Sequence, residues 1–285
     1  MKQVICLVIL GLFCSNAVLA NRNEKVTAEA AVLVNGKNVI KTEAAEQSGR
    51  LVNGVAADIA KYPFAITLRL YDYFYCGATV ISFSHALTAA ETVYSFRSLT
   101  KNLTLYGGTS STFAGGVSFQ VIRIAIHPGF NPIVRESDFN IAVLTVPTNA
   151  FVGKRNIAPI PLGSAEVEIG TKCTVLGSGI TNIDPIRTAS TLRSADMIIS
   201  SQATCARVWA PLSVKITSKQ VMLCAKGANG TDLCRGDIGS ALVCRGRLTG
   251  ISFIINMQCD KARDTGYMKI TAPGIRSFIR SQSGV

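Results

Sequence analysis

The sequence predicts an all-β fold that carries one helix near its C-terminus. Residues 64–70 and 119–127 alternate apolar and polar side chains, which is the period of a half-buried strand. Glycine and proline separate such segments at intervals that suit a β-barrel or a β-sandwich. The helix is predicted at about 273–282, because Pro273 stands near its start and apolar residues recur on one face.

Residues 1–20 are predicted to be a secretion signal that is removed. Lys2 provides a charged start, residues 4–14 are apolar, and small residues lead to Ala20, where a signal peptidase would cut. A membrane anchor is the alternative, but it needs about 18 or more consecutive apolar residues. No later segment reaches that length. We therefore expect a secreted chain that does not span a membrane.

Residues 21–50 differ in composition from the rest of the chain. They contain no cysteine, tryptophan or phenylalanine, and they are rich in alanine, glutamate, lysine and asparagine. We interpret them as a pro-segment or linker that ends at Arg50. The remaining residues, 51–285, suffice for one large domain or two small ones, and their apolar content is ample for a packed core.

The net charge is strongly positive, at +12 for the whole sequence. Removing the signal with its single lysine leaves +11 (12 − 1). The basic residues are scattered without a run of five, so a solvated surface explains them, and no nucleic-acid-binding motif is present. Binding to acidic glycans remains an alternative, because a basic surface attracts polyanions.

The cysteine count is odd once the signal is removed. Nine cysteines occur in the sequence, and two of them, Cys6 and Cys14, lie in the predicted signal. Of the seven that remain, at least one must lack an intramolecular partner. A secreted chain folds in an oxidising compartment, where disulfides persist. We therefore expect disulfide bonds together with one unpaired cysteine.

A series of short stretches resembles the motifs of one enzyme family, in collinear order from residue 50 to about residue 280. These stretches are RLVNG (50–54), YCGATVIS (75–82), LTAAET (87–92), SDFNIAVLTV (137–146), CTVLGSG (173–179), DLCRGDIGSALVC (232–244), GISF (250–253) and TGYMKIT (265–271). They resemble motifs of the trypsin/chymotrypsin-like serine proteases. The resemblance implies two six-stranded antiparallel β-barrels, at about 51–155 and 156–270, with the catalytic cleft between them.

Two of the three catalytic positions of that family are replaced in this sequence. The mechanism needs a serine hydroxyl, a histidine that takes its proton and an aspartate that orients the histidine. Glu91 stands at the histidine position and Ile238 at the serine position, while Asp138 matches the aspartate. Because isoleucine has no nucleophilic atom, the resemblance implies an inactive homologue. An active trypsin-like endopeptidase that cleaves after Arg or Lys is the alternative that family membership alone suggests.

The resemblance also assigns backbone groups and an activation site. The N–H groups of Gly236 and Ile238 match the oxyanion hole. Arg50 and Leu51 form a trypsin-type cleavage site, and Asp237 matches the aspartate that receives the new amino terminus. Our hypothesis is that cleavage still frees Leu51 to pair with Asp237, so that a conformational switch survives without catalysis. The alternative is an inherited aspartate held by other hydrogen bonds.

The specificity pocket combines retained and altered positions. Asp232 matches the carboxylate that binds Arg or Lys in trypsin-like members, and Gly266 matches one of the two wall glycines. Ile254 replaces the other wall glycine, and its branched side chain is expected to narrow the pocket. An enclosed Asp232 needs a partner, because a buried unpaired charge is costly. Glu91 and Asp138 alone make a weak metal site, so no metal and no cofactor are expected.

Disulfides follow from the resemblance, and glycosylation sites follow from the residues themselves. The implied disulfides are Cys173–Cys244, Cys205–Cys224 and Cys234–Cys259. Cys76 is the expected unpaired cysteine, because Thr92 replaces its family partner, and an intermolecular bridge is the alternative to a buried thiol. Sequons at Asn102 and Asn229 predict N-glycosylation.

Together these features predict a secreted, non-catalytic serine protease homologue. Inactive members of the family are thought to act as cofactors, decoys or binding modules beside active proteases. We therefore expect a binding or regulatory role, with a protease, an inhibitor or a cascade component as the protein partner.

Overall fold

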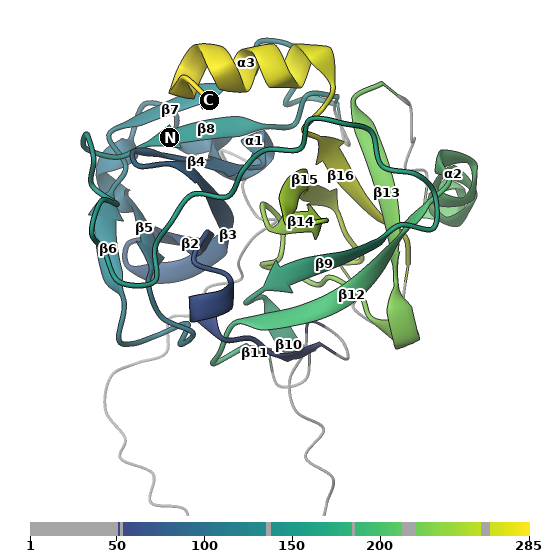
Figure 1. The fold of residues 1–285 in the computed structure, drawn as a ribbon, viewed down its shortest axis with the longest axis horizontal. Coiled ribbons are helices and arrows are strands. Elements are labelled where there is room, and N and C mark those ends of the chain that lie inside the picture. The colour runs from purple at the N-terminus through teal and green to yellow at the C-terminus, as the bar shows by residue number, and fades with distance from the viewer. Residues whose placement is uncertain (1–50, 52–53, 135–137, 184–185, 213–219, 258–262) are drawn as a thin grey trace, which may run out of the picture.

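The computed structural model describes residues 51, 54–134, 138–183, 186–212, 220–257 and 263–285. Within these residues the chain forms two large β-sheets side by side, and helix α3 (Pro273–Ser283) lies over the first of them (Figure 1). One sheet closes into a six-stranded barrel and the other curves into a half-barrel. The predicted all-β, chymotrypsin-like fold with a short C-terminal helix is confirmed.

The first sheet contains seven strands in the order β6-β5-β2-β3-β4-β8-β7. They are β2 (Ala65–Leu70), β3 (Tyr73–Ser82), β4 (His85–Thr88), β5 (Leu103–Gly107), β6 (Val117–Gln120), β7 (Arg123–Ile126) and β8 (Ala142–Thr145). The edge strands β6 and β7 are consecutive in the chain. Where they meet, the Val121 N–H donates to the Leu103 carbonyl at 3.0 Å and the Ile122 N–H donates to the Thr145 carbonyl at 2.8 Å. One extended segment thus pairs with β5 and then with β8, which curls the sheet.

The second sheet closes on itself. Its order is β1-β12-β13-β16-β15-β14-β9, and β9 pairs with both β14 and β12. Its strands are β1 (Val55–Ala56), β9 (Lys172–Gly177), β12 (Arg193–Ser200), β13 (Met222–Gly227), β14 (Ala241–Cys244), β15 (Arg247–Ile254) and β16 (Thr265–Lys269). A two-stranded sheet of β10 (Ile180–Ile183) and β11 (Ile186–Thr188) follows β9. The disulfide Cys173–Cys244 joins β9 to β14 where the two cysteines face each other in the ladder.

Short helices connect the strands. They are α1 (Ala90–Val93), α2 (Gln202–Trp209), η1 (Ile59–Lys61), η2 (Tyr94–Phe96), η3 (Thr100–Asn102), η4 (Ala210–Leu212) and η5 (Ala228–Gly230). The C-terminal helix α3 matches the predicted range, with Pro273 in its first turn and Gly284 in the left-handed region (φ 78°) at its end. Its buried residues are Ile275, Phe278 and Ile279. Arg123 of β7 donates to Gln282 Oε1 at 2.9 Å, which fastens α3 to the half-barrel.

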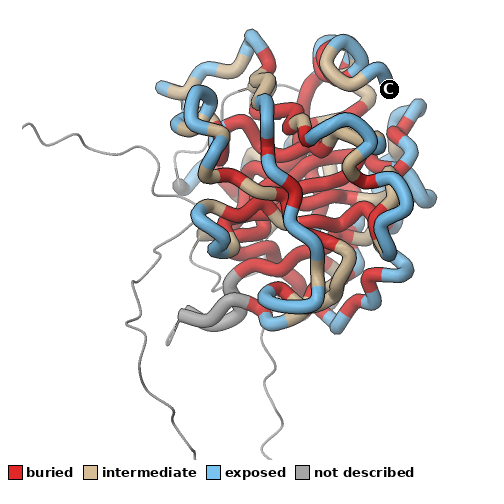
Figure 2. Tube along the Cα trace, turned by 90° about the vertical axis from the view of Figure 1, so that its left-hand side faces the viewer, coloured by how far each residue is buried: buried red, intermediate tan, exposed pale blue. Residues whose placement is uncertain are grey.

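The strand interiors are buried, and the connecting segments carry most of the exposed residues (Figure 2). Leu68 of β2 and Leu144 of β8 are fully buried in the half-barrel, as are Met197 of β12 and Met222 of β13 in the closed barrel. Removing such side chains from water is the main favourable contribution to folding. No helix in the described part of the chain is long and apolar enough to cross a membrane.

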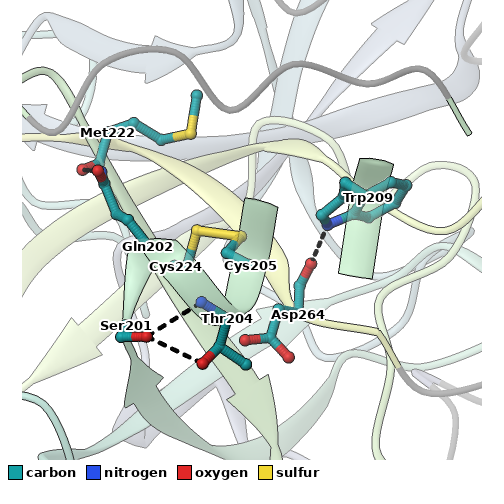
Figure 3. Close-up of a disulfide and its surroundings, with 8 residues drawn as sticks. All are labelled: Ser201, Gln202, Thr204, Cys205, Trp209, Met222, Cys224 and Asp264. Atoms are coloured by element: carbon teal, nitrogen blue, oxygen red, sulfur yellow. Dashed lines mark hydrogen bonds between the residues drawn. A yellow bond between two sulfur atoms is a disulfide. The ribbon is translucent and has the colours of Figure 1, made fainter. Parts of the chain in front are cut away.

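A second disulfide, Cys205–Cys224, fastens α2 to β13 (Figure 3). Ser201 caps α2, since its Oγ accepts a hydrogen bond from the Thr204 N–H at 3.0 Å. At the other end of α2, the indole N–H of Trp209 donates to the Asp264 carbonyl at 2.6 Å. Because Asp264 directly precedes β16, these contacts fix the position of that strand.

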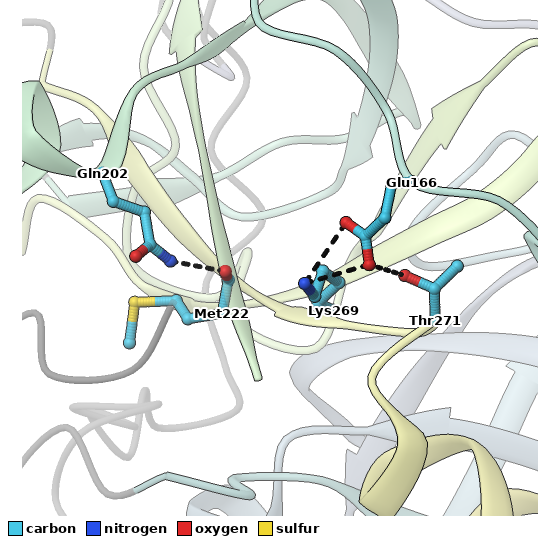
Figure 4. Close-up of polar contacts among 5 residues, drawn as sticks. All are labelled: Glu166, Gln202, Met222, Lys269 and Thr271. Atoms are coloured by element: carbon cyan, nitrogen blue, oxygen red, sulfur yellow. Dashed lines mark hydrogen bonds and ion pairs between the residues drawn. The ribbon is translucent and has the colours of Figure 1, made fainter. Parts of the chain in front are cut away.

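Polar contacts also hold the far end of β16 (Figure 4). The Nζ atom of Lys269 lies 3.0 Å from Oε1 of Glu166, and the Thr271 hydroxyl donates to the same oxygen at 3.0 Å. Nearby, the Gln202 amide donates to the Met222 carbonyl at 2.6 Å. Glu166 belongs to the segment that connects the two sheets, so these contacts tie that connection to β16. Because Glu166 is exposed, its ion pair contributes at most about 1 kcal/mol.

Candidate catalytic cleft

Glu91 lies in the short helix α1, next to the end of strand β4. Its side chain is exposed. Its backbone N–H donates to Oδ1 of Asn140 at 2.9 Å, and the Asn140 side chain is only 1% exposed. A buried amide oxygen therefore holds the backbone at the position where the family has its histidine.

The structure corrects the assignment of Asp138 to the aspartate position. In the family motif Asp-Ile-Ala-Leu-Leu the acid directly precedes the isoleucine, and here the residue directly before Ile141 is Asn140. Asn140 is buried against Glu91, whereas Asp138 lies two residues earlier and is half-buried. Aligning the motif on Ile141-Ala142 without a gap would have found this. All three triad positions are thus replaced, by Glu91, Asn140 and Ile238.

The loop that carries Ile238 keeps a tightly bonded backbone. The Ile238 side chain is 3% exposed, and its carbonyl accepts from the Gly77 N–H at 2.9 Å. The next residue, Gly239, has φ +85°, and a Cβ there would lie 2.2 Å from the Gly77 carbonyl oxygen. Glycine is therefore required at this position. The loop has kept its turn and packing without a nucleophilic atom.

The backbone N–H groups expected to form an oxyanion hole are those of Gly236 and Ile238. Among the described residues, neither group donates a hydrogen bond to a protein acceptor. Gly236 has φ +91°, and a Cβ on it would lie 2.8 Å from the ring of Phe74. The ring of Phe74, from β3, thus packs directly on this turn. Further along the same loop, Ser240 packs against Gly77 of β3. A Cβ atom added to Gly77 would lie 2.4 Å from Oγ of Ser240.

Asp237 is fully buried and bonded to backbone groups. Its Oδ1 accepts from the Gly179 N–H at 2.8 Å, and its Oδ2 accepts from the Cys234 N–H at 3.0 Å. Burial raises its pKa to about 7, although these hydrogen bonds act in the opposite direction. Leu51 is also fully buried, but it is not bonded to Asp237, and Arg50 lies outside the described residues.

Asp232 is buried and bonded to a neighbouring asparagine. This carboxylate is 2% exposed, and its Oδ2 accepts from the Nδ2 group of Asn256 at 3.1 Å. Ile254 stands opposite Gly266 in the sheet, where a Cβ on the glycine would lie 2.9 Å from Cβ of Ile254. Burial raises the pKa of Asp232 to about 7, against the lowering effect of the Asn256 hydrogen bond. A side chain of this chain therefore occupies the space beside the pocket glycine.

Asn256 was not predicted from the sequence. The need for a partner of Asp232 was a general consequence of burying a charge, but no motif pointed to this asparagine. The loop that carries Ile238 also holds the segment next to Asn256, since the Arg235 Nε–H donates to the Met257 carbonyl at 2.8 Å. The loop that carries Ile238 and the segment after β15 are therefore joined beside Asp232.

The cysteines occupy distinct environments. The structure contains the implied disulfides Cys173–Cys244 and Cys205–Cys224, while Cys234 is disulfide-bonded and Cys259 lies outside the described residues. Cys76 is the free cysteine of the described chain and is fully buried. Its Sγ lies 3.9 Å from Oγ1 of Thr88, so it faces the protein interior.

The remaining site residues are placed as follows. Thr92, at the position of the missing cysteine, donates its hydroxyl to the Ala89 carbonyl at 2.8 Å. Asn102 lies at the end of η3, whereas the side chain of Asn229 lies outside the described residues. Within the described residues, no group of three or more His, Cys, Asp or Glu side chains is arranged to hold a metal ion.

Comparison with known proteins identifies the family. The family model described as "Trypsin" matches residues 51–275, and the chain belongs to this family. It is 31% identical over 203 residues to trypsin delta of Drosophila melanogaster, covering 71% of this chain and 77% of that protein. It is 33% identical to trypsin alpha-4 of Lucilia cuprina over the same length, covering 71% and 76%.

Two solved structures share the fold. Neuropsin, a serine protease expressed in mouse brain, matches with a TM-score of 0.69 and 26% identity, over 81% of this chain and 98% of that one. The scabies mite inactivated protease paralogue S-D1 matches with a TM-score of 0.70 and 21% identity, over 81% and 97%. The second likeness concerns the fold alone.

The pH dependence of stability tests the burial of Asp232. The native state holds the Asp232 proton up to about pH 7, and an unperturbed aspartate releases it near 3.8, so the free energy of unfolding should fall as the pH rises between these values. Asp232→Asn should reduce this fall by roughly 2–4 kcal/mol, while Asp196→Asn, at an exposed position of β12, should leave it unchanged. Urea unfolding across this pH range measures the effect, and equal profiles for the wild type and Asp232→Asn would contradict it.

Proposed function

We propose that this protein is a secreted, non-catalytic member of the trypsin family that acts by binding other proteins. The observation that carries the proposal is the replacement of all three triad positions by Glu91, Asn140 and Ile238. Acyl transfer by the family mechanism needs a nucleophile, a base and an orienting carboxylate. An isoleucine cannot attack a peptide bond, and the reference pKa of the glutamate side chain, about 4.3, makes this residue type a poor base for a serine hydroxyl.

The burial of Asp232 supports the same proposal. A basic substrate side chain would have to reach Asp232, which is 2% exposed and bonded to Asn256. Displacing Asn256 would also remove a hydrogen bond from a buried carboxylate. The cleft is therefore unsuited to recognising Arg or Lys, and we infer that the protein has kept the fold as a scaffold for protein recognition, with a protease, an inhibitor or a cascade component as partner.

Secretion is supported by independent features. Residues 1–20 have the charge, apolar run and small residues of a signal peptide. The disulfides Cys173–Cys244 and Cys205–Cys224 are typical of proteins that fold in an oxidising compartment. We therefore propose that the chain acts outside the cell.

Rebuilding the triad tests the proposal with a fluorophosphonate probe that labels active serine proteases. The wild type should not be labelled, because it has no serine at position 238. The triple variant Glu91→His/Asn140→Asp/Ile238→Ser should react, because it restores nucleophile, base and orienting acid. The double variant Glu91→His/Ile238→Ser keeps Asn140 and should react about 10⁴-fold more slowly than the triple variant, as loss of that carboxylate does in the chymotrypsin family.

The double variant separates the two candidate acids. If Asp138 oriented the new histidine, the double and triple variants would react at similar rates. Disulfide content and the unfolding midpoint of each variant serve as folding controls. Labelling of the wild type would refute the non-catalytic proposal outright.

Cleavage after Arg50 is proposed to leave a conformational switch in place. The new ammonium group at Leu51 would stabilise the charged form of Asp237 and so lower its pKa from about 7. The uncleaved chain should therefore lose more stability than the cleaved chain as the pH rises towards about 7. N-terminal sequencing of the secreted protein, followed by unfolding of both forms, measures this. A secreted chain that always begins near Asn21, or identical pH profiles for the two forms, would contradict the switch.

A further inference from the structure

Asn102 lies beside the tip of the β2–β3 hairpin and is bonded to it twice. Its side-chain Nδ2 group donates to the hydroxyl of Tyr71 at 3.0 Å. Its backbone carbonyl accepts from the Tyr71 N–H at 2.9 Å. Asn102 is half-buried, while Tyr71 is 64% exposed. An exposed aromatic ring is thus held next to this particular amide.

The turn that holds the ring has an unusual backbone. Leu70 pairs with Tyr73, so Tyr71 and Asp72 form a two-residue loop, and both have positive φ, at 51° and 65°. A turn of this kind normally uses Asn and Gly, because larger side chains are disfavoured at positive φ. Tyrosine stands here although a smaller residue would suit the turn better. Strain of this kind is often found where a side chain has a role.

Two neighbouring rings at the hairpin tip are open to solvent. Tyr71 is 64% exposed and Tyr73 is 72% exposed. Aromatic rings have a negative face, which attracts the partially positive C–H groups of a sugar ring. The tip therefore offers a surface on which a carbohydrate attached to the adjacent amide can pack.

We propose that Asn102 carries an N-linked glycan whose first N-acetylglucosamine packs on the ring of Tyr71. The residues Asn102-Leu103-Thr104 form an acceptor sequence for this modification. An asparagine amide has two N–H donors, so one can be replaced by the sugar while the other continues to bond the Tyr71 hydroxyl. The inference depends on the chain reaching the secretory lumen and does not depend on the absence of catalysis.

Attachment of the glycan to Asn102 needs a sugar donor, which the secreting cell supplies. The donor is an oligosaccharide joined through a pyrophosphate to a polyprenyl lipid. A bond forms between Nδ2 of Asn102 and C1 of the first sugar, and the C1–O bond to the pyrophosphate breaks. The lipid pyrophosphate leaves with that electron pair, and the amide loses one proton. No oxidant or reductant is required.

Occupancy is tested at Thr104, whose Oγ1 atom is buried and has no hydrogen-bond partner in the structure. Thr104→Val removes the hydroxyl that the acceptor sequence requires without breaking a bond, and Thr104→Ser keeps the sequence. The full chain is expressed behind a cleavable leader that directs it to the lumen, and leader removal is verified. An amidase then removes the glycans in heavy-oxygen water, which converts a glycosylated asparagine to an aspartate labelled with heavy oxygen. Peptide mapping should find this labelled aspartate at position 102 in the wild type and in Thr104→Ser. It should show unmodified Asn102 in Thr104→Val.

The packing on Tyr71 is tested by trimming the glycan. An endoglycosidase that leaves one sugar should not change the unfolding midpoint, whereas complete removal should lower it by about 2 °C or more. Complete removal converts Asn102 to aspartate, so an Asn102→Asp variant is the matched control. The shift should persist in Tyr71→Phe and disappear in Tyr71→Ala.

The results that overturn the proposal are distinct from those that bear on catalysis. Unmodified Asn102 in wild-type protein that has lost its leader would remove the site. Equal midpoints for the trimmed and fully deglycosylated forms, or an unchanged shift in Tyr71→Ala, would remove the packing on Tyr71. The fluorophosphonate experiment is independent of all of these outcomes.

Discussion

The buried carboxylate of Asp237 is the contact on which the arrangement of the cleft depends. It binds the N–H groups of Gly179 and Cys234, and so joins the segment after β9 to the loop that carries Ile238. From the same loop the Ile238 carbonyl accepts from Gly77 of β3, which belongs to the half-barrel. A short stretch of backbone thereby connects both sheets. Removing Asp237 would leave buried N–H groups without acceptors, which is costly.

These contacts explain how the fold accommodates Glu91, Asn140 and Ile238 in the cleft. The contacts that hold the loop are made by backbone groups and by Asp237, none of which depends on the side chain at position 238. At position 91 the contact is again made by a backbone N–H, and the amide oxygen of Asn140 accepts it as a carboxylate oxygen would. Exchanging the side chains at positions 91 and 238 therefore leaves these backbone contacts in place.

Much of the fold could be predicted from the sequence, because motif order and residue period are local properties. Pro273 and the apolar face of α3 placed the helix, and the resemblance to the family implied the disulfides Cys173–Cys244 and Cys205–Cys224.

The remainder depends on contacts between distant segments. Asn256 reaches Asp232 only because the segment after β15 lies next to the loop that carries Ile238. The contact of Asn102 with Tyr71 depends on the conformation of the β2–β3 turn. Asn140 is a different case, because it could have been found by aligning the motif on Ile141. Asp138 was assigned instead, because it is the acidic residue nearest to the motif.

The central proposal is that the cleft does not recognise a basic side chain, and binding of benzamidine tests it most directly. This planar aromatic cation pairs with an accessible pocket aspartate. Trp209, the only tryptophan in the sequence, bonds to Asp264 beside the pocket wall and can report binding by fluorescence alongside calorimetry. We predict no saturable binding to the wild type at concentrations that saturate an active trypsin, and binding to the variant Ile254→Gly. Saturable binding to the wild type, abolished by Asp232→Asn, would contradict the account.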